Sequence, residues 1–224
     1  MSRYLLVHGS WCGGWVWDRI TTRLRDHGHT VITPTLSGPG GTEIAEPGLI
    51  RHIHEVTRLL EDQTILVGHS YGGMVVAGVA GAHPRCVLQT VYLDAFLPFP
   101  GESAFDLMPV IRGPFTKAAL AAGGRTVPPF GLDRLGFTDP DLVARLRPIS
   151  MATHEEPLPW STGVDDQPPI RYVLFGDRSP FSPMAVRAQE RGAKCLTIAT
   201  GHTGLWTTPD EVRAAITDDK RETS

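Results

Sequence analysis

A serine set between closely spaced glycines is the feature of this 224-residue chain that is best suited to chemistry. Ser70 is the third residue of GHSYG (68–72), which fits the pattern Gly-x-Ser-x-Gly. The apolar run 64–67 precedes it and the small residues of 71–82 follow it, which predicts a strand, a sharp turn and a helix. Glycines on both sides remove the Cβ atoms that would collide in so tight a turn. A chance match in a glycine-rich chain is the alternative, but the strand-turn-helix context favours a nucleophile beside the amide N–H groups of a helix N-terminus.

Short apolar runs alternate with helical patterns along most of the chain. The predicted strands are 4–7, 30–33, 64–67, 87–93, 171–175 and 195–199, and the predicted helices are 15–26, 49–61, 71–82, 183–191 and 208–217. Strands separated by helices of this length pair in parallel through right-handed crossovers, with helices on both faces. The pattern therefore predicts an α/β fold with a mainly parallel sheet of about six strands.

One stretch, 97–169, breaks this alternation. It is rich in proline and glycine, and its weaker helical segments are 103–109, 116–122 and 139–147. Ligands bind at the carboxyl edge of parallel sheets, so an insertion there is expected to cover the site as a cap. The core would then consist of residues 1–96 and 170–224. A disordered linker is the alternative, and the aromatic and aliphatic content of the stretch argues against it.

Two segments near strand ends occur together: VHGSWCGGW at 7–15 and GHSYGGM at 68–74. Together they resemble the plant methylesterase and hydroxynitrile lyase branch of the α/β-hydrolase superfamily and its bacterial relatives. The likeness extends over nearly the whole chain and is weakest in the cap. It implies the α/β-hydrolase fold and the activity of a carboxylic ester hydrolase. In that family the residue after His-Gly and the residue after the serine supply the amides of the oxyanion hole, which implies Ser10 and Tyr71 here.

His202 is the histidine that we expect to act as general base. It lies in TGHTG (200–204), directly after the last predicted strand, and the catalytic histidine comes last in this fold. A loop at that place can bring an imidazole over Ser70. The remaining histidines lie at turns, at helix ends, on the helix 49–61 or in the serine turn, except His154, which lies in the cap where it could touch substrate.

The carboxylate that orients the histidine has two candidates. The usual place is a Gly-x-x-Asp arrangement after the fifth strand, but 176–179 reads GDRS, so Ser179 holds the expected position and Asp177 comes two residues early. Asp94 follows the fourth strand, in a segment that resembles some haloalkane dehalogenases, where the acid follows this strand. Either carboxylate could accept the imidazole Nδ1–H. We favour Asp94, with Asp177 as the alternative and a dyad without either as the third possibility.

Aromatic residues near the strand ends and in the cap suit a small apolar or aromatic substrate, although some of them are expected to serve only as core. The residues that we expect to bind substrate are Trp11, Cys12, Phe96, Trp160 and Phe181. The predicted reaction is hydrolysis of an ester, thioester or lactone by acyl transfer through a Ser-His-Asp triad.

Other activities on the same fold are open alternatives. One is a cofactor-free lyase or cyclase that uses the same triad, and another is a non-catalytic protein that binds small molecules. Hydroxynitrile lyases of the resembling branch have a lysine after the catalytic histidine and a threonine at the position of Gly9. Here Thr203 follows the histidine, and both differences favour the esterase.

Composition and charge argue against other classes of partner. The net charge of −3 gives no reason to expect nucleic acid or a membrane surface. The glycines at 38–41 lack the residues that hold phosphates, and no histidine-carboxylate cluster has metal spacing, so neither cofactor nor metal is expected. Three widely spaced cysteines, with an N-terminal apolar run too short for a signal peptide, predict reduced thiols and a cytoplasmic location. The oligomeric state is left open, and a homodimer is compatible with the sequence.

Overall fold

The computed structural model describes residues 1–38, 47–159 and 167–217. Six strands form one sheet in the order β2-β1-β3-β4-β7-β8, and every neighbouring pair is parallel. The strands are β1 (Arg3–Val7), β2 (Thr30–Ile32), β3 (Thr64–His69), β4 (Val87–Leu93), β7 (Ile170–Phe175) and β8 (Lys194–Ile198). The predicted parallel sheet is confirmed.

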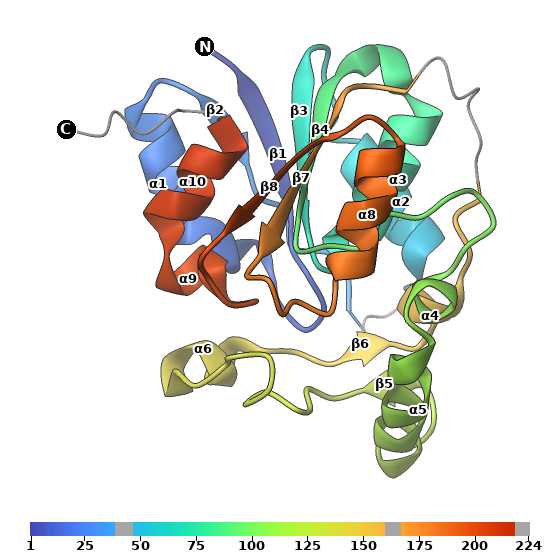
Figure 1. Ribbon diagram of the computed structural model, residues 1–224. Helices are drawn as coiled ribbons and strands as arrows, with labels where there is room; N and C mark the ends of the chain where they lie inside the picture. The colour runs from blue at the N-terminus through green and yellow to red at the C-terminus, as the bar shows by residue number, and fades with distance from the viewer. Residues whose placement is uncertain (39–46, 160–166, 218–224) are drawn as a thin grey trace.

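Helices cover both faces of this sheet (Figure 1). One face carries the short helix η1 (Gly14–Trp17), α1 (Asp18–Asp26), α9 (Gly204–Thr207) and α10 (Pro209–Thr217); the other carries α2 (Leu49–Thr57), α3 (Gly72–Ala82) and α8 (Ser182–Glu190). Side chains of β1 alternate between the two apolar clusters: Tyr4 and Leu6 belong with α1 and α10, while Leu5 and Val7 belong with α2 and α3. This alternation follows from the two-residue period of a strand. Because helices cover both faces of the sheet, all residues of the run 4–7 are apolar.

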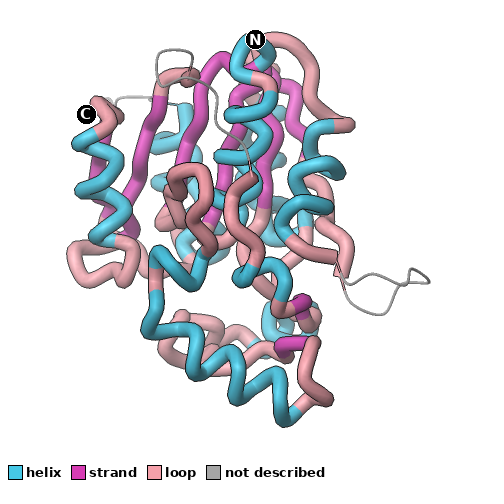
Figure 2. Tube along the Cα trace, turned by 90° about the vertical axis from the view of Figure 1, so that its right-hand side faces the viewer, coloured by secondary structure: helices cyan, strands magenta, loops and turns pink. Residues whose placement is uncertain are grey.

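A long insertion joins β4 to β7. After the turn η2 (Pro84–Cys86) and β4, the chain forms α4 (Ala104–Leu107), η3 (Pro109–Ile111), α5 (Arg112–Ala121), β5 (Thr126–Val127), α6 (Pro140–Arg145), β6 (Ile149–Ser150) and α7 (Ala152–Glu155). Most of these elements lie beneath the carboxyl ends of the strands in Figure 1, and Figure 2 shows the same arrangement from the side. The segment thus occupies the place that a cap requires, and the division into core and cap stays a prediction.

The loop after β1 anchors the insertion. The indole Nε1 of Trp11 donates to the carbonyl oxygen of Val127 at 3.1 Å, and the amide of Arg147 donates to the carbonyl oxygen of Trp11 at 2.8 Å. The Trp11 ring also packs against Phe115 in the apolar cluster of the insertion. The inserted layer is therefore bound directly to the sheet edge. No helix among the described residues has the length and apolarity needed to cross a bilayer.

Candidate active site

The serine turn between β3 and α3 requires unusual backbone geometry. Ser70 has a φ of 54°, in the left-handed region that side chains other than glycine rarely adopt. A Cβ at Gly68 would lie 2.7 Å from the carbonyl oxygen of Gly72, and one at Gly72 would lie 2.3 Å from the carbonyl oxygen of Val7. Both flanking glycines are therefore required for β3 to turn into α3 across the end of β1.

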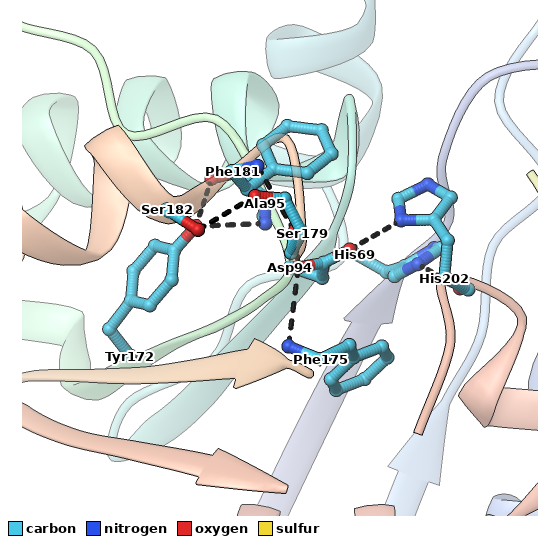
Figure 3. A network of polar contacts seen from close by, with 9 residues as sticks. All are labelled: His69, Asp94, Ala95, Tyr172, Phe175, Ser179, Phe181, Ser182 and His202. Atoms are coloured by element: carbon cyan, nitrogen blue, oxygen red, sulfur yellow. Dashed lines mark hydrogen bonds and ion pairs between the residues drawn. The ribbon is translucent and has the colours of Figure 1, made fainter. Parts of the chain in front are cut away.

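A buried carboxylate meets the imidazole of His202, which lies in the loop between β8 and α9 (Figure 3). His202 Nδ1 lies 2.6 Å from Asp94 Oδ2. Asp94 follows β4 with a φ of 45° and is only 1% exposed. Its other oxygen accepts from the amide of Phe175 at 3.2 Å and from the hydroxyl of Ser179. Hydrogen bonds on both oxygens satisfy a charge that burial alone would make costly.

Asp177, the second candidate acid, lies exposed in the turn after β7. Ser179, which stands where the family pattern has its aspartate, donates instead to Asp94. The structure therefore brings Asp94 to His202 and leaves Asp177 at the surface. The catalytic role of either residue stays a prediction.

Two further contacts hold His202 in place. Its ring stacks on that of Phe181, with 5.5 Å between centroids and 10° between planes. His69 Nε2 donates to the carbonyl oxygen of His202 at 3.0 Å. Burial, and then the neighbouring His202, lower the pKa of His69 well below its usual value, so this ring is neutral. Sequence reasoning did not assign a role to His69, because its partner lies 133 residues away.

Ser70 and His202 line one cavity of about 210 Å³ between the sheet edge and the insertion. Of the predicted substrate-binding residues, Trp11, Cys12, Phe96 and Phe181 line it. Trp160 lies outside the described residues. The insertion adds the side chains of Met108, Val110, Ile111, Phe115, Leu135, Phe137 and His154. Burial raises the pKa of Cys12 to about 12, so this thiol contributes an apolar wall and no nucleophile.

Two backbone amides of the described residues have no hydrogen-bond partner and are candidates for an oxyanion hole. In the part of the chain that the structure describes, neither the Ser10 amide nor the Tyr71 amide donates a hydrogen bond to another protein group. Tyr71 directly precedes α3, where the helix dipole adds partial positive charge. Ser10 follows Gly9, at which an added Cβ would lie 2.8 Å from Ser70 Cβ. A threonine in place of Gly9 would crowd the serine, so the difference from hydroxynitrile lyases has a steric consequence here.

His154 reaches the cavity from α7 of the insertion. Its Nε2 lies 3.4 Å from the hydroxyl of Ser10, although 144 residues separate the two in the chain. The ring is 1% exposed, and burial lowers its pKa to about 3. The imidazole is therefore neutral at physiological pH. The sequence placed His154 in the cap, but nothing in the sequence indicated its contact with Ser10.

Comparison with known proteins agrees with this architecture. Residues 4–215 match the family described as "Alpha/beta hydrolase family". The carbendazim hydrolyzing esterase of Nocardioides sp. (strain SG-4G) is 33% identical over 240 residues, which cover 95% of this chain and 97% of that protein. Salicylic acid-binding protein 2 of Nicotiana tabacum is 32% identical over 106 residues, covering 43% of this chain and 40% of that protein.

Solved structures give the same result for the fold. An extracellular alpha/beta-hydrolase from a Paenibacillus species has a TM-score of 0.84 at 23% identity, with 99% of this chain and 100% of that chain covered. A pyrethroid hydrolase from Sphingobium faniae JZ-2 has a TM-score of 0.75 at 25% identity, with 97% and 96% covered. The predicted fold class and the resemblance to methylesterases and their bacterial relatives are confirmed.

Proposed function

Because this chain belongs to the α/β hydrolase family, we propose that it is a serine esterase that hydrolyses esters of small apolar or aromatic molecules. The observation that carries the proposal is that Ser70 and His202 line one cavity, while His202 is hydrogen-bonded to the buried Asp94. A relative that is similar over almost its full length is named as an esterase, which supports the same reaction. Thioesters and lactones react through the same acyl transfer and belong to the proposed class.

Asp94 selects the tautomer of the base. Its carboxylate accepts from His202 Nδ1–H, so the lone pair of the neutral imidazole is on Nε2. Nε2 takes the Ser70 hydroxyl proton as Oγ attacks the ester carbonyl, and negative charge develops on the carbonyl oxygen. The amides of Ser10 and Tyr71 stabilise that charge, and loss of one such donor typically costs about a hundredfold or more in rate.

The second half of the cycle uses the same groups. The imidazolium of His202 donates its proton to the leaving alcohol as the ester C–O bond breaks, which leaves an acyl group on Ser70 Oγ. Water then gives a proton to His202 Nε2 and attacks the acyl carbonyl. Collapse of this second oxyanion returns the proton to Ser70 and releases the acid.

The cavity favours small, apolar substrates. Its volume of about 210 Å³ lies below the range of roughly 300–1,000 Å³ that is usual for drug-sized ligands. The walls from the insertion are mostly aliphatic and aromatic side chains. A short ester with an aromatic or branched apolar group satisfies both conditions.

We further propose a cytoplasmic location. Cys12, Cys86 and Cys195 are all free thiols, which is typical of proteins in reducing compartments.

The test is turnover of short p-nitrophenyl esters, combined with labelling by a fluorophosphonate and peptide mass spectrometry. We expect the label on Ser70, and we expect Ser70→Ala to lower kcat by at least about a thousandfold. Ser37→Ala is the matched control, because this buried hydroxyl has no partner among the described residues and lies outside the cavity of Ser70. Labelling at another residue, or full activity of Ser70→Ala, would contradict the proposal. Tight ligand binding without turnover would instead indicate a binding protein.

A further inference from the structure

His154 is held in a single tautomer by its neighbours in the insertion. Thr153 Oγ1 donates its only proton to the carbonyl oxygen of Ser150 at 2.6 Å, and the same oxygen lies 2.8 Å from His154 Nδ1. Since a carbonyl oxygen can only accept, Thr153 Oγ1 has no proton left for the imidazole and must accept from Nδ1–H. The ring is neutral, so its Nε2 carries a lone pair and acts only as an acceptor.

The ring is also fixed in orientation. It stacks on Tyr71 with 5.3 Å between centroids and 20° between planes, and the rings of Phe115 and Phe105 lie 4.5 Å and 5.6 Å away. These contacts leave the imidazole almost no access to bulk water. An acceptor in such surroundings gains more from a hydrogen bond than an acceptor in water does.

The existing partner of Nε2 is a weak one. In the described part of the chain, Nε2 makes one polar contact, to the Ser10 hydroxyl at 3.4 Å, which is long for a hydrogen bond. Among the described residues of the insertion that line the cavity, His154 is also the only one with a polar side chain. A buried acceptor without a good donor loses free energy, and a better-placed donor would recover it.

We propose that His154 Nε2 accepts a hydrogen bond from the substrate, and that the site thereby selects esters with an N–H or O–H group beside the scissile carbonyl. The place of this donor group follows from Ser10, whose hydroxyl contacts Nε2 and whose amide is assigned to the oxyanion in the proposed mechanism. This inference rests on the proposed esterase function and deepens it by naming the substrate class. A site built to receive a donor rejects an analogue without one, because its own polar group is then left unpaired.

The experiment compares pairs of esters in which methylation removes the donor. One pair is methyl mandelate and methyl α-methoxyphenylacetate, and the other is methyl 2-aminobenzoate and methyl 2-(dimethylamino)benzoate. For each pair, the preference is the kcat/KM of the donor-bearing ester divided by the kcat/KM of its methylated analogue. We expect this preference to be about tenfold to a hundredfold larger in the wild-type protein than in His154→Phe. Phenylalanine keeps an aromatic ring among its aromatic neighbours but has no acceptor. His154→Gln, whose amide oxygen can reach the place of Nε2, should retain part of the preference.

Thr153→Val is a second variant, which leaves the imidazole intact and removes the group that fixes its tautomer. We expect an intermediate preference, so the inference remains testable if His154→Phe does not fold. Calorimetric binding of the same esters to Ser70→Ala provides a readout that does not need turnover. Equal preferences in the wild type and these variants, in turnover and in binding, would overturn the role of His154 while leaving the esterase proposal intact. Preferential binding without any turnover would support His154 and contradict the esterase.

Discussion

The carboxyl edge of the sheet and the insertion beneath it form two walls of one cavity, and they differ in how they are built. On the sheet side, Ser70, Asp94 and His202 are held by strand ends and by hydrogen bonds between distant segments. On the insertion side, apolar side chains predominate, and His154 is the single polar side chain among the described insertion residues that line the cavity. The proposed mechanism therefore assigns the reaction to the sheet edge, and the proposed role of His154 assigns the selection of substrates to the insertion.

Exchange of the acid should give the largest effect, and it tests the sheet side alone. Asp94→Asn keeps the shape of the side chain, but the carboxylate that accepts from Nδ1–H is replaced by an amide. The amide can donate to Nδ1 and so favour the wrong tautomer of His202. We expect kcat to fall by about 10⁴-fold, as is typical for this change in a serine triad. Asp177→Asn is the matched control and should leave ester hydrolysis unchanged. A large loss in the control together with an active Asp94→Asn would reverse the assignment of the acid.

A smaller effect is expected at Ser179, which supports the same carboxylate. Ser179→Ala removes one hydrogen bond from Asp94 Oδ1, while the Phe175 amide still donates to that oxygen. We expect kcat to fall about tenfold with KM unchanged, because the orientation of the base is affected rather than substrate binding.

The double variant Asp94→Asn/Ser179→Asp offers a sharper test. Recovery of part of the activity lost in Asp94→Asn would show that a carboxylate at 179 can reach His202.

On the insertion side, removal of an apolar contact should change binding and spare the chemistry. Leu135 lines the cavity and is half-buried, so Leu135→Ala removes contact area without opening the core. We expect KM for an apolar ester to rise about fivefold with kcat nearly constant. Steady-state kinetics on a series of p-nitrophenyl esters would measure both constants. A fall in kcat at constant KM would mean that the insertion takes part in the reaction itself.

Acidification should lower the stability of the fold, because both walls of the cavity contain a buried neutral histidine. Burial lowers the pKa of His8, at the sheet edge, to about 4 and that of His154 to about 3, from a usual value of 6.5. Between pH 6.5 and the lowered pKa of each histidine, the unfolded chain binds more protons than the folded one. The stability of the fold therefore falls as the pH drops below 6.5.

At pH 5 each such histidine costs about 2 kcal/mol relative to pH 7. His154→Phe should therefore lose less stability than the wild type when urea unfolding at pH 7 is compared with unfolding at pH 5. An equal loss in both proteins would mean that the imidazole is accessible to protons in the folded state.

The sheet and the serine turn were predictable from the sequence, because they depend on local patterns. Buried runs such as 64–67 and the spacing of glycines around Ser70 are visible within a few residues. The pairing of β5 with β6 was not predicted, since two strands of two residues each leave no periodic signal and join through contacts distant in the chain. The helix predicted over 49–61 ends at Thr57, which periodicity alone does not define.

The candidate site shows the same limit. The sequence indicated that Ser179 replaces the usual aspartate, but it could not show that its hydroxyl supports Asp94, 85 residues earlier. The contact between His154 and Ser10 is likewise a product of how the insertion folds back on the sheet. Contacts of this kind depend on tertiary packing, for which a single sequence provides no direct pattern.

The left-handed backbone at positions 70 and 94 has a thermodynamic consequence for the whole fold. Each non-glycine residue in that region costs about 1–3 kcal/mol, which is a sizeable part of the margin that keeps a domain folded. Glycine would adopt the same torsion angles with less strain, so replacing the hydroxyl or the carboxylate there would ease the main chain while removing the reactive group. At these two positions, the side chains that the proposed activity needs therefore lower the stability of the fold relative to glycine.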